Sequence, residues 1–558
     1  MKIGYFKEKS SNNNVTSFLE RRAKMTPDKP IFYRAANDNG RILHEKISYQ
    51  EFVDQSSRIA AGYRKLAIQE GDRVIVFLPM SVELYLVISS LQRIGAIPVF
   101  LDSWSRRAQL ENVIQQIKPK AIISFGTAFE FCKTIPKADS IKIKIEVGKN
   151  TGQYSANLQE LVSEDVGSPI LSLLSEHTAL ITFTTGSSGT PKGADRTHRF
   201  LAAQHYALDE VVPYLETDID MPTFPVFALN NIATGITTII PAVNLSEYEK
   251  LDPAILVSQL KESGATCATL SPAIFNKISA YCITEKIKLP KLRRFITGGA
   301  PISRDDLVRF QSVATGSETI ILYGSTEVEP IAHITANEWL SMDHKESDNF
   351  LLDHGVNVGK IVKSLKYRFI KLNKKPVAVS QSTDWKKLET NQNIGELIVA
   401  GEHVCDKYYD NQTAWKAVKI RDVDGTVWHR TGDLGRVDDK GYLWIIGRVH
   451  NAILRNKKYF YPIPVEIILK KLPFVSQAAY LGLPDKKLNE KAVVIVAPKK
   501  ILSQEKNSWE SEIKKILQGL AIPVDEIFFV ETIPMDPRHH SKIEYGELRK
   551  QIENQTIV

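Results

Sequence analysis

The chain has 558 residues, which is too long for one hydrophobic core, so two or more domains are expected. With 43% apolar and 24% charged residues, the composition is that of an ordinary globular protein. Four widely spaced cysteines indicate neither a disulfide framework nor a zinc site, and they fit a reducing cytoplasm. The polar N-terminus and the absence of an apolar run of about 18–20 residues predict no secretory signal and no integral membrane segment.

The net charge of +8 includes several lysine pairs near the C-terminus, such as Lys470-Lys471 and Lys514-Lys515. We expect these pairs to form a solvated face, although a nucleotide, an acidic carrier or an anionic membrane would also be attracted to them. No nucleic-acid-binding motif is present, so no nucleic-acid partner is expected.

The first two-thirds of the chain alternates apolar strand-like runs with helix-like stretches, which predicts an α/β fold with parallel sheets covered by helices. Helical spacing is found in Val82–Arg93 and Ala254–Lys261. The expected strands are Arg73–Phe77, Pro98–Leu101, Ala121–Ser124, Ala179–Thr184, Thr266–Leu270, Phe295–Thr297 and Thr319–Tyr323.

A loop rich in glycine and hydroxyl residues follows the strand that ends near Phe183. Glycines allow successive backbone N–H groups to converge on an anion, and hydroxyls and one lysine add further donors. A solvated turn is the alternative. A Walker A loop is excluded, because Pro191 precedes the lysine. The expected phosphate-binding residues are Thr184, Thr185, Gly186, Ser187, Ser188, Gly189, Thr190 and Lys192.

The residues after Arg448 read as a second, smaller α+β unit of about 110 residues. Its expected strands are Val475–Leu481, Ala492–Ala497 and Ile527–Glu531, and its expected helices are Trp509–Leu517 and Ile543–Glu553. We therefore predict a large N-terminal body over residues 1–447 and a small mobile lid domain over 448–558. The lysine-rich stretch Lys360–Asn393 is expected to be an exposed loop or hairpin.

The loop Thr-Thr-Gly-Ser-Ser-Gly-Thr-Pro-Lys-Gly resembles the phosphate loop of the adenylate-forming superfamily, which includes acyl-CoA synthetases, adenylation domains and luciferases. The resemblance extends from Val15 to about Lys550, with the motifs in the family's order. It implies that ATP and a carboxylic acid are the substrates, that Mg²⁺ is the cofactor, and that the loop holds the β- and γ-phosphates while the carboxylate attacks the α-phosphate.

Two further motifs follow expected strands at the edge of a sheet where ligands bind in such folds. The resemblance implies that the strap Gly298, Gly299, Ala300 and Pro301 lies against adenine. It implies that in Tyr323-Gly324-Ser325-Thr326-Glu327 the tyrosine stacks on adenine, the threonine contacts the α-phosphate, and the glutamate binds Mg²⁺ together with Thr184. A hard cation prefers carboxylate oxygen. An N-capped turn is the structural alternative for the second motif.

The resemblance gives three residues nearer the C-terminus specific roles. Asp433 would accept both ribose hydroxyls, and Arg448 would sit at the domain hinge and contact ribose or phosphate. Lys542 would swing in and bridge the carboxylate and the α-phosphate, where charge builds up. We therefore expect the lid to rotate about residues 447–450.

Several details resemble the β-lactone synthetases of olefin biosynthesis, notably Phe224–Gly235, Glu327–Pro330 and Arg538–Lys542. Ala228 stands where many acyl-CoA synthetases have a histidine, and the residues after Arg448 lack their usual Asp, Lys and Gly, which argues against CoA as a cofactor. The expected acyl pocket is lined by Phe224, Phe227, Ala228, Asn230, Asn231 and Gly235.

The leading hypothesis is therefore ATP-dependent adenylation of a carboxylic acid, a long-chain β-hydroxy acid in the specific version, followed by closure to a β-lactone. Acyl-processing enzymes are the expected protein partners. The alternatives are ligation to CoA or to a carrier protein, a nucleotide-binding regulator without catalysis, and a phosphotransferase.

Overall fold

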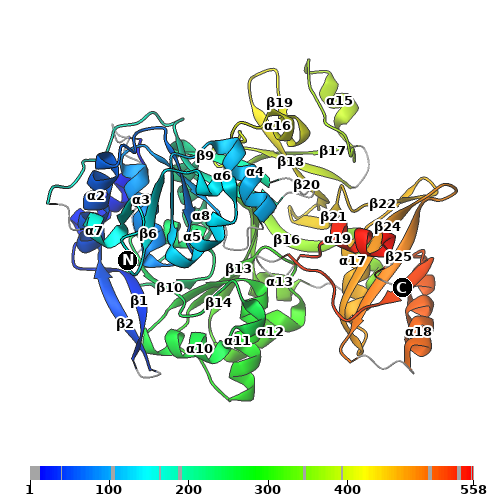
Figure 1. Ribbon diagram of the computed structural model, residues 1–558. Coiled ribbons are helices and arrows are strands. Elements are labelled where there is room, and N and C mark those ends of the chain that lie inside the picture. Colours follow the sequence, from blue (N-terminus) through cyan, green and yellow to red (C-terminus); the bar gives the residue numbers. More distant parts are fainter. Residues whose placement is uncertain are drawn as a thin grey trace. The chain divides into compact units, whose positions relative to one another are not determined.

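The computed structural model describes residues 13–38, 41–101, 107–162, 165–185, 191–342, 347–390, 394–500, 505–536, 542–554 and 556. The chain forms two compact units (Figure 1). Unit 1 comprises Met1–Ile331 and Gly401–Trp415, and unit 2 comprises Ala332–Ala400 and Lys416–Val558. The domain boundary expected at residue 447 remains a prediction.

The first sheet of unit 1 is parallel except for its last pair, β8 and β9, which is antiparallel. Three of its strands, Arg73–Phe77, Ile97–Phe100 and Ala121–Phe125, are buried along most of their length, as apolar runs without alternation require. In spatial order they are β7 (Ala156–Asn157), β6 (Ile143–Val147), β5 (Ala121–Phe125), β3 (Arg73–Phe77), β4 (Ile97–Phe100), β8 (Thr178–Thr185) and β9 (Pro191–Thr197).

A second set of paired strands in unit 1 is parallel up to the β1–β2 hairpin. In spatial order these strands are β14 (Glu318–Ser325), β13 (Arg294–Gly298), β12 (Cys267–Leu270), β10 (Ile219–Pro222), β11 (Thr237–Ile239), β1 (Pro30–Asp38) and β2 (Arg41–Ser48).

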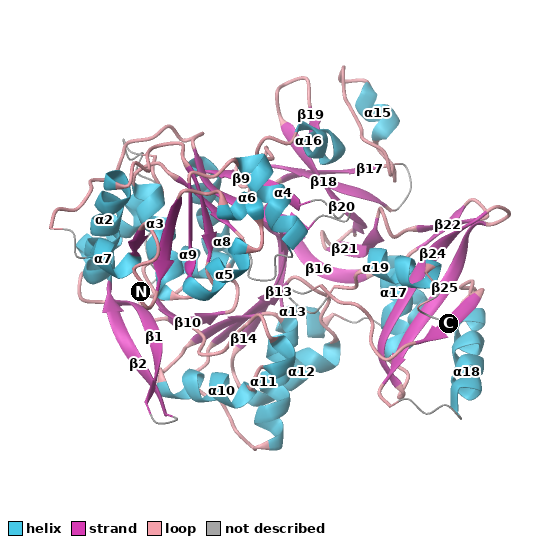
Figure 2. Cartoon of the chain, in the orientation of Figure 1, coloured by secondary structure: helices cyan, strands magenta, loops and turns pink. Residues whose placement is uncertain are grey.

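The helices of unit 1 flank these two sheets, and α10, α11 and α12 lie together beside β13 and β14 (Figure 2). Among the described residues, no helix has both the length and the apolar character needed to cross a membrane. The helices are α1 (Thr16–Met25), α2 (Tyr49–Lys65), α3 (Val82–Arg93), α4 (Arg107–Ile117), α5 (Gly126–Lys133), α6 (Pro136–Asp139), α7 (Leu158–Val162), α8 (His198–Val211), α9 (Pro225–Thr234), the 3-10 turn η1 (Tyr248–Lys250), α10 (Pro253–Glu262), α11 (Pro272–Thr284) and α12 (Arg304–Val313).

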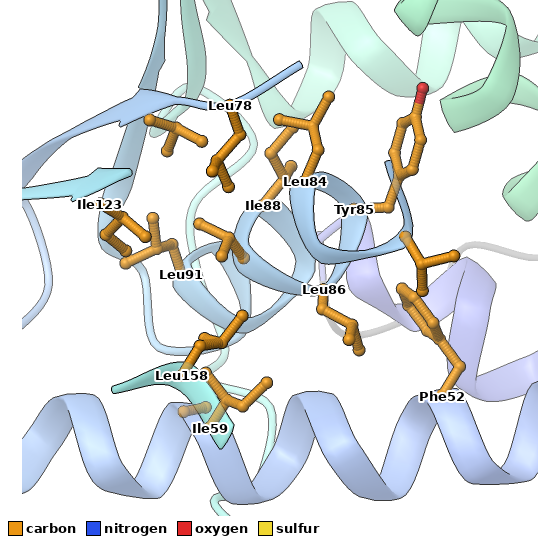
Figure 3. Packing of buried hydrophobic residues seen from close by; sticks show 14 of the residues in the cluster. Phe52, Ile59, Leu78, Leu84, Tyr85, Leu86, Ile88, Leu91, Ile123 and Leu158 are labelled. Atoms are coloured by element: carbon orange, nitrogen blue, oxygen red, sulfur yellow. The ribbon is translucent and has the colours of Figure 1, made fainter. Parts of the chain in front are cut away.

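Helix α3 is the central helix of a large core in unit 1 (Figure 3). Ser81 caps its N-terminus by accepting a hydrogen bond from the backbone of Leu84 at 3.2 Å. Phe52 and Ile59 of α2 pack against it, and its apolar side chains extend to several sides. A helix that is apolar nearly all round must be buried, and α3 is.

Unit 2 contains a sheet of antiparallel strands and a C-terminal sheet of its own. The first includes β15 (Val328–Thr335, shared with unit 1), β16 (Val356–Ile361), β21 (Leu443–Arg448), β20 (Val427–Val437), β18 (Gly395–Ala400), β17 (Lys366–Ile370) and β19 (Lys419–Arg421), with helices α13 (Ala336–Ser341), α14 (Asp348–His354), α15 (Asp384–Leu388) and α16 (Gln412–Val418, also shared). The second has β22 (Ile453–Arg455), β23 (Lys458–Phe460), β24 (Val475–Asp485), β25 (Asn489–Pro498) and β26 (Glu526–Phe529), with helices α17 (Pro462–Lys470), α18 (Lys506–Gly519) and α19 (Tyr545–Glu553).

The C-terminal sheet buries both faces because its apolar residues run without interruption along β24 and β25. Tyr480 and Val494 point to the core that includes α17 and α18, whereas Leu481 and Val493 point to the core that includes α19. This alternation is the two-residue period of a strand.

The expected α/β fold and every strand and helix expected from the sequence are confirmed, with ends that differ by at most four residues. The prediction for Lys360–Asn393 is wrong in part. Lys366–Ile370 forms β17 and pairs with β18, and Ile370 and Trp385 are buried. Ile370, Val377 and Trp385 lie among these lysines in the sequence and belong to a small core, so the lysine-rich composition concealed a strand.

Strands β13 and β14 approach so closely at Gly298 that a side chain has no room there. A Cβ on Gly298 would lie 2.3 Å from the carbonyl oxygen of Leu322. Gly299 is different, because its φ of +84° is left-handed but no atom lies within 4 Å of the position of its Cβ. The first glycine is therefore required by packing and the second by backbone conformation.

Gly298→Ala is expected to destabilise the protein more than Gly299→Ala. The second change costs only the left-handed conformation, about 1–2 kcal/mol, whereas the first must push β13 away from β14. Urea unfolding midpoints of the two variants and the wild type measure this. Equal midpoints for the two variants would show that the close approach does not matter.

A buried carboxyl group links helix α17 to the start of α19. Glu466 Oε1 accepts hydrogen bonds from the hydroxyl of Tyr545 at 2.6 Å and from the backbone N–H of Tyr480 at 3.0 Å. Burial raises the pKa of Glu466 to about 7, against the hydrogen bonds and the charge of Lys470, which lower it. The carboxyl thus binds its proton more tightly in the folded than in the unfolded chain.

This shift makes the contribution of Glu466 to stability depend on pH. Since its folded pKa is raised, the contribution is complete below about pH 4.5, the unfolded pKa, and is lost as the pH rises towards about 7. Glu466→Gln keeps an acceptor oxygen but does not titrate. The melting temperature of this variant relative to wild type is expected to rise from about pH 5 to about pH 8. The exposed Glu547→Gln is the control, and a difference independent of pH for Glu466→Gln would contradict the assignment.

Candidate functional site

The first sequence motif leaves the sheet at the end of β8 and returns along β9. Thr184 and Thr185 are the last residues of β8, and Thr184 pairs with Lys192 of β9. The loop residues Gly186, Ser187, Ser188, Gly189 and Thr190, and the side chains of both threonines, lie outside the described residues. The motif therefore stands at the strand end where it was expected, and its phosphate contacts remain a prediction.

The strap begins at Gly298, the last residue of β13. Gly299 and Pro301 are exposed and Ala300 is half-buried. Because nothing stands within 4 Å above the backbone at Gly299, a flat ring has room to lie against it. The strap is paired through β13 with β14, the strand that leads into the next motif.

The second motif occupies the end of β14 and the turn after it, and Tyr323, Gly324, Ser325, Thr326 and Glu327 are all half-buried. A Cβ on Gly324 would lie 2.9 Å from the carbonyl oxygen of Val328, so this turn is tight. The Oγ atom of Ser325 is buried and has no hydrogen-bond partner in the described part of the chain. A ligand that accepts or donates a hydrogen bond there would satisfy it.

Two residues outside the sequence motifs contact this turn. Arg196 of β9 is buried and donates a hydrogen bond from Nη2 to the carbonyl oxygen of Thr326 at 2.7 Å. The hydroxyl of Tyr408 donates to Glu327 Oε1 at 2.9 Å. Burial and the Glu327 carboxylate raise the pKa of Tyr408 well above its usual range. The sequence did not indicate a role for either residue, because their contacts with this turn join parts of the chain that are distant in sequence.

The six residues predicted to line the acyl pocket lie on helix α9 and at its two ends. Phe224 precedes the helix, and its ring lies 5.9 Å from that of Phe227. Phe227 is buried, and Ala228 is buried in the core around α3. Gly235 ends the helix in the left-handed conformation at φ +90°, against the side chain of Arg22.

The two asparagines of α9 contact other buried polar groups of unit 1. Asn230 Oδ1 lies 2.8 Å from His205 Nδ1. Asn231 donates to Asp220 at 2.9 Å, and the same carboxylate accepts from Thr269 at 3.1 Å. Burial raises the pKa of Asp220 to about 6. These contacts fix α9 against β10 and β12, and a pocket lined by the six predicted residues remains a prediction.

The remaining predicted residues belong to unit 2. Asp433 and Arg448 are cross-strand partners on β20 and β21, and Arg448 Nε lies 2.9 Å from Asp433 Oδ1. Asp433 is 7% exposed. The ion pair holds this carboxylate in one orientation, as an acceptor for hydroxyl groups must be held.

Lys542 is exposed and lies shortly before α19. Its backbone N–H donates to Asp536 Oδ1 at 2.7 Å, and its carbonyl oxygen accepts from the N–H of Asp536 at 2.7 Å. The backbone of the predicted catalytic lysine is therefore held by two hydrogen bonds to Asp536. Arg538, His539, His540 and Ser541, which precede Lys542 in the sequence, lie outside the described residues.

The donors near Glu327 fit a magnesium ion that is bound together with ATP. Glu327 offers a carboxylate, and Mg²⁺ is held in such sites by one or two carboxylates and by phosphate oxygens. The hydrogen bond from Tyr408 uses one of the roughly four acceptor positions of a carboxylate. The orphaned hydroxyl of Ser325, two residues away, is a further polar group suited to the same ligand.

Comparison with known proteins agrees with this arrangement. The family model described as "AMP-binding enzyme" matches residues 19–409. Olefin beta-lactone synthetases of Stenotrophomonas maltophilia and Xanthomonas campestris are 28% and 27% identical, over 84% and 95% of this chain and 85% and 96% of theirs. The long-chain-fatty-acid–CoA ligase FadD13 of Mycobacterium tuberculosis is 23% identical over 94% of this chain and 96% of its own.

Among solved structures, ATP-bound MatB from Rhodopseudomonas palustris superposes with a TM-score of 0.77 at 20% identity, covering 98% of this chain and 99% of that one. This similarity shows the fold. Because the family model matches most of the length, the chain belongs to the AMP-binding enzymes, the adenylate-forming ligases and synthetases that activate carboxylic acids.

Proposed function

We propose that this enzyme activates a long-chain β-hydroxy acid with ATP and then closes the acyl-adenylate to a β-lactone. The observation that carries the proposal is the similarity to olefin beta-lactone synthetases along nearly the whole chain. The departures after Arg448 from the pattern of many acyl-CoA synthetases, where this chain reads Val449-His450-Asn451, support it.

The nucleotide would be held by turns at the ends of three strands. Gly298–Pro301 and Tyr323 would enclose adenine, and the loop at 184–192 would hold the β- and γ-phosphates through backbone N–H groups, hydroxyls and Lys192. Asp433 would accept the ribose hydroxyls, with Arg448 beside it. Glu327 and Thr184 would hold Mg²⁺, which supplies positive charge that offsets the charge on the phosphates.

The first chemical step would join two anions. A carboxylate oxygen attacks the α-phosphorus, the bond to pyrophosphate breaks, and pyrophosphate leaves. Lys542 would contact both anions and stabilise the charge that develops between them, assisted by Thr326. Since Lys542 is exposed and far from the other motifs in sequence, we expect residues 448–558 to rotate about 447–450 to bring it in.

The second step would need no external nucleophile. The β-hydroxyl oxygen of the bound acyl group attacks its own carbonyl carbon and loses its proton. The bond from that carbon to the adenylate oxygen breaks, so AMP leaves with one former carboxylate oxygen. The acyl pocket around α9 would hold the chain in the bent conformation that this attack requires, and proximity supplies much of the rate.

Lys542→Ala is expected to lower acid-dependent ATP–pyrophosphate exchange by about 100-fold or more, because a donor that stabilises the transition state is lost. Lys550→Ala, an exposed lysine on α19, is the matched control and should exchange like the wild type. Exchange by Lys542→Ala at the wild-type rate would remove this residue from the mechanism.

The products distinguish lactone formation from ligation. The enzyme is incubated with ATP, Mg²⁺ and a panel of fatty, β-hydroxy and aryl acids, with and without CoA, and the products are identified by mass spectrometry. We expect a β-lactone and AMP from β-hydroxy acids without CoA. If AMP forms only with CoA, and a thioester accompanies it for every β-hydroxy acid, the enzyme is an acyl-CoA ligase.

A further inference from the structure

The segment from His403 to Tyr409, which we name the clasp, belongs to unit 1, although the neighbouring stretches Ala332–Ala400 and Lys416–Val558 belong to unit 2. It therefore crosses into unit 1 for a short stretch and then leaves. The clasp lies between two strands that carry sequence motifs, β9 after the phosphate loop and the start of β15 after Glu327.

On one side, the clasp is hydrogen-bonded to the strand that carries Lys192. The backbone N–H of Tyr409 donates to the carbonyl oxygen of Gly193 at 2.9 Å, and the N–H of Asp195 donates to the carbonyl oxygen of Lys407 at 3.2 Å. Ala194 and Tyr408 form a β-bridge. These contacts fix the backbone directly after the phosphate loop.

On the other side, the clasp is bonded to the turn that carries Glu327. The backbone N–H of Cys405 donates to the carbonyl oxygen of Glu327 at 2.8 Å, and Val404 forms a β-bridge with Val328. His403 Nε2 lies 2.9 Å from the carbonyl oxygen of Pro330. The clasp thus holds the phosphate-loop strand and the Glu327 turn at a fixed separation.

One side chain of the clasp contacts the carboxylate that we propose binds the metal ion. The hydroxyl of Tyr408, which is only 6% exposed, donates to Glu327 Oε1 at 2.9 Å. A hydroxyl that donates to one carboxylate oxygen restricts the rotation of the carboxylate. Partners of this kind, behind the direct ligand, tune metal affinity in many proteins.

We propose that Tyr408 is a positioning residue for the metal-binding carboxylate: its hydroxyl orients Glu327 toward the cation while the clasp sets the distance from the Glu327 turn to β9, the strand that carries Lys192. The inference rests on the proposed function, because it takes Glu327 as the ligand of Mg²⁺. It adds a residue and a segment that no motif of the site includes.

The test compares Tyr408→Phe with Tyr409→Phe. Each change removes one hydroxyl, but the ring of Tyr409 packs against the apolar core that includes Ile181 and Phe183. Binding of Mn²⁺ to the enzyme–ATP complex is followed by electron paramagnetic resonance. We expect the Kd for Mn²⁺ to rise about 10-fold or more for Tyr408→Phe and to stay within about twofold for Tyr409→Phe.

Glu327→Gln and the double variant with Tyr408→Phe complete the experiment, and thermal melts check that each protein is folded. We expect Glu327→Gln to weaken Mn²⁺ binding, and the second change to add nothing further, because Tyr408 acts through Glu327. Additive losses would overturn the inference, as would equal losses for the two tyrosine variants or wild-type affinity for Tyr408→Phe.

The same measurements distinguish an error in the proposed metal ligand from an error in the positioning role of Tyr408. If Glu327→Gln binds Mn²⁺ with wild-type affinity, Glu327 is not the metal ligand and the proposed role of this residue is wrong. If Glu327→Gln weakens binding and Tyr408→Phe does not, the ligand assignment holds and only the positioning role is wrong.

Discussion

Strands and turns that carry the nucleotide motifs of unit 1 pack too closely for side chains at several glycines. A Cβ at Gly193 would lie 2.9 Å from the ring of Phe183, at Gly298 it would lie 2.3 Å from a carbonyl oxygen of β14, and at Gly324 it would lie 2.9 Å from one of β15. This close packing fixes the backbone of β9, β13 and β14 at positions within the motifs. The proposed ATP site depends on it, because backbone N–H groups bind phosphate only where they are held rigidly.

In unit 2, ion pairs hold in place the strand that carries a residue of the proposed ATP site. Arg430 of β20 forms an ion pair with Glu396 of β18 at 2.5 Å, and both side chains are almost fully buried. Removing one partner would leave an uncompensated buried charge, which is strongly destabilising. Three residues further along β20, Asp433 is held by Arg448. The two ion pairs thus fix the position of β20 and, with it, the carboxylate of Asp433 that we propose binds ribose.

The sequence predicted the strands that end at Phe77, Thr184 and Leu270 and the helix Val82–Arg93, because apolar runs and helical spacing are local signals. It missed the short paired strands β9 and β17, whose polar residues carry no such signal. It also missed Arg196, Asp220 and Tyr408, which contact residues of the proposed site that are distant in sequence. The motif residues themselves were found from resemblance to a family, whereas their supporting contacts required the fold.

The central claim is that a carboxylate oxygen becomes bonded to the α-phosphorus of ATP. The most direct test uses a β-hydroxy acid labelled with ¹⁸O in both carboxyl oxygens, with mass spectrometry of the nucleotide product. The account predicts one ¹⁸O atom in each AMP released, and pyrophosphate without label. Label in inorganic phosphate together with ADP, or AMP without label, would contradict it.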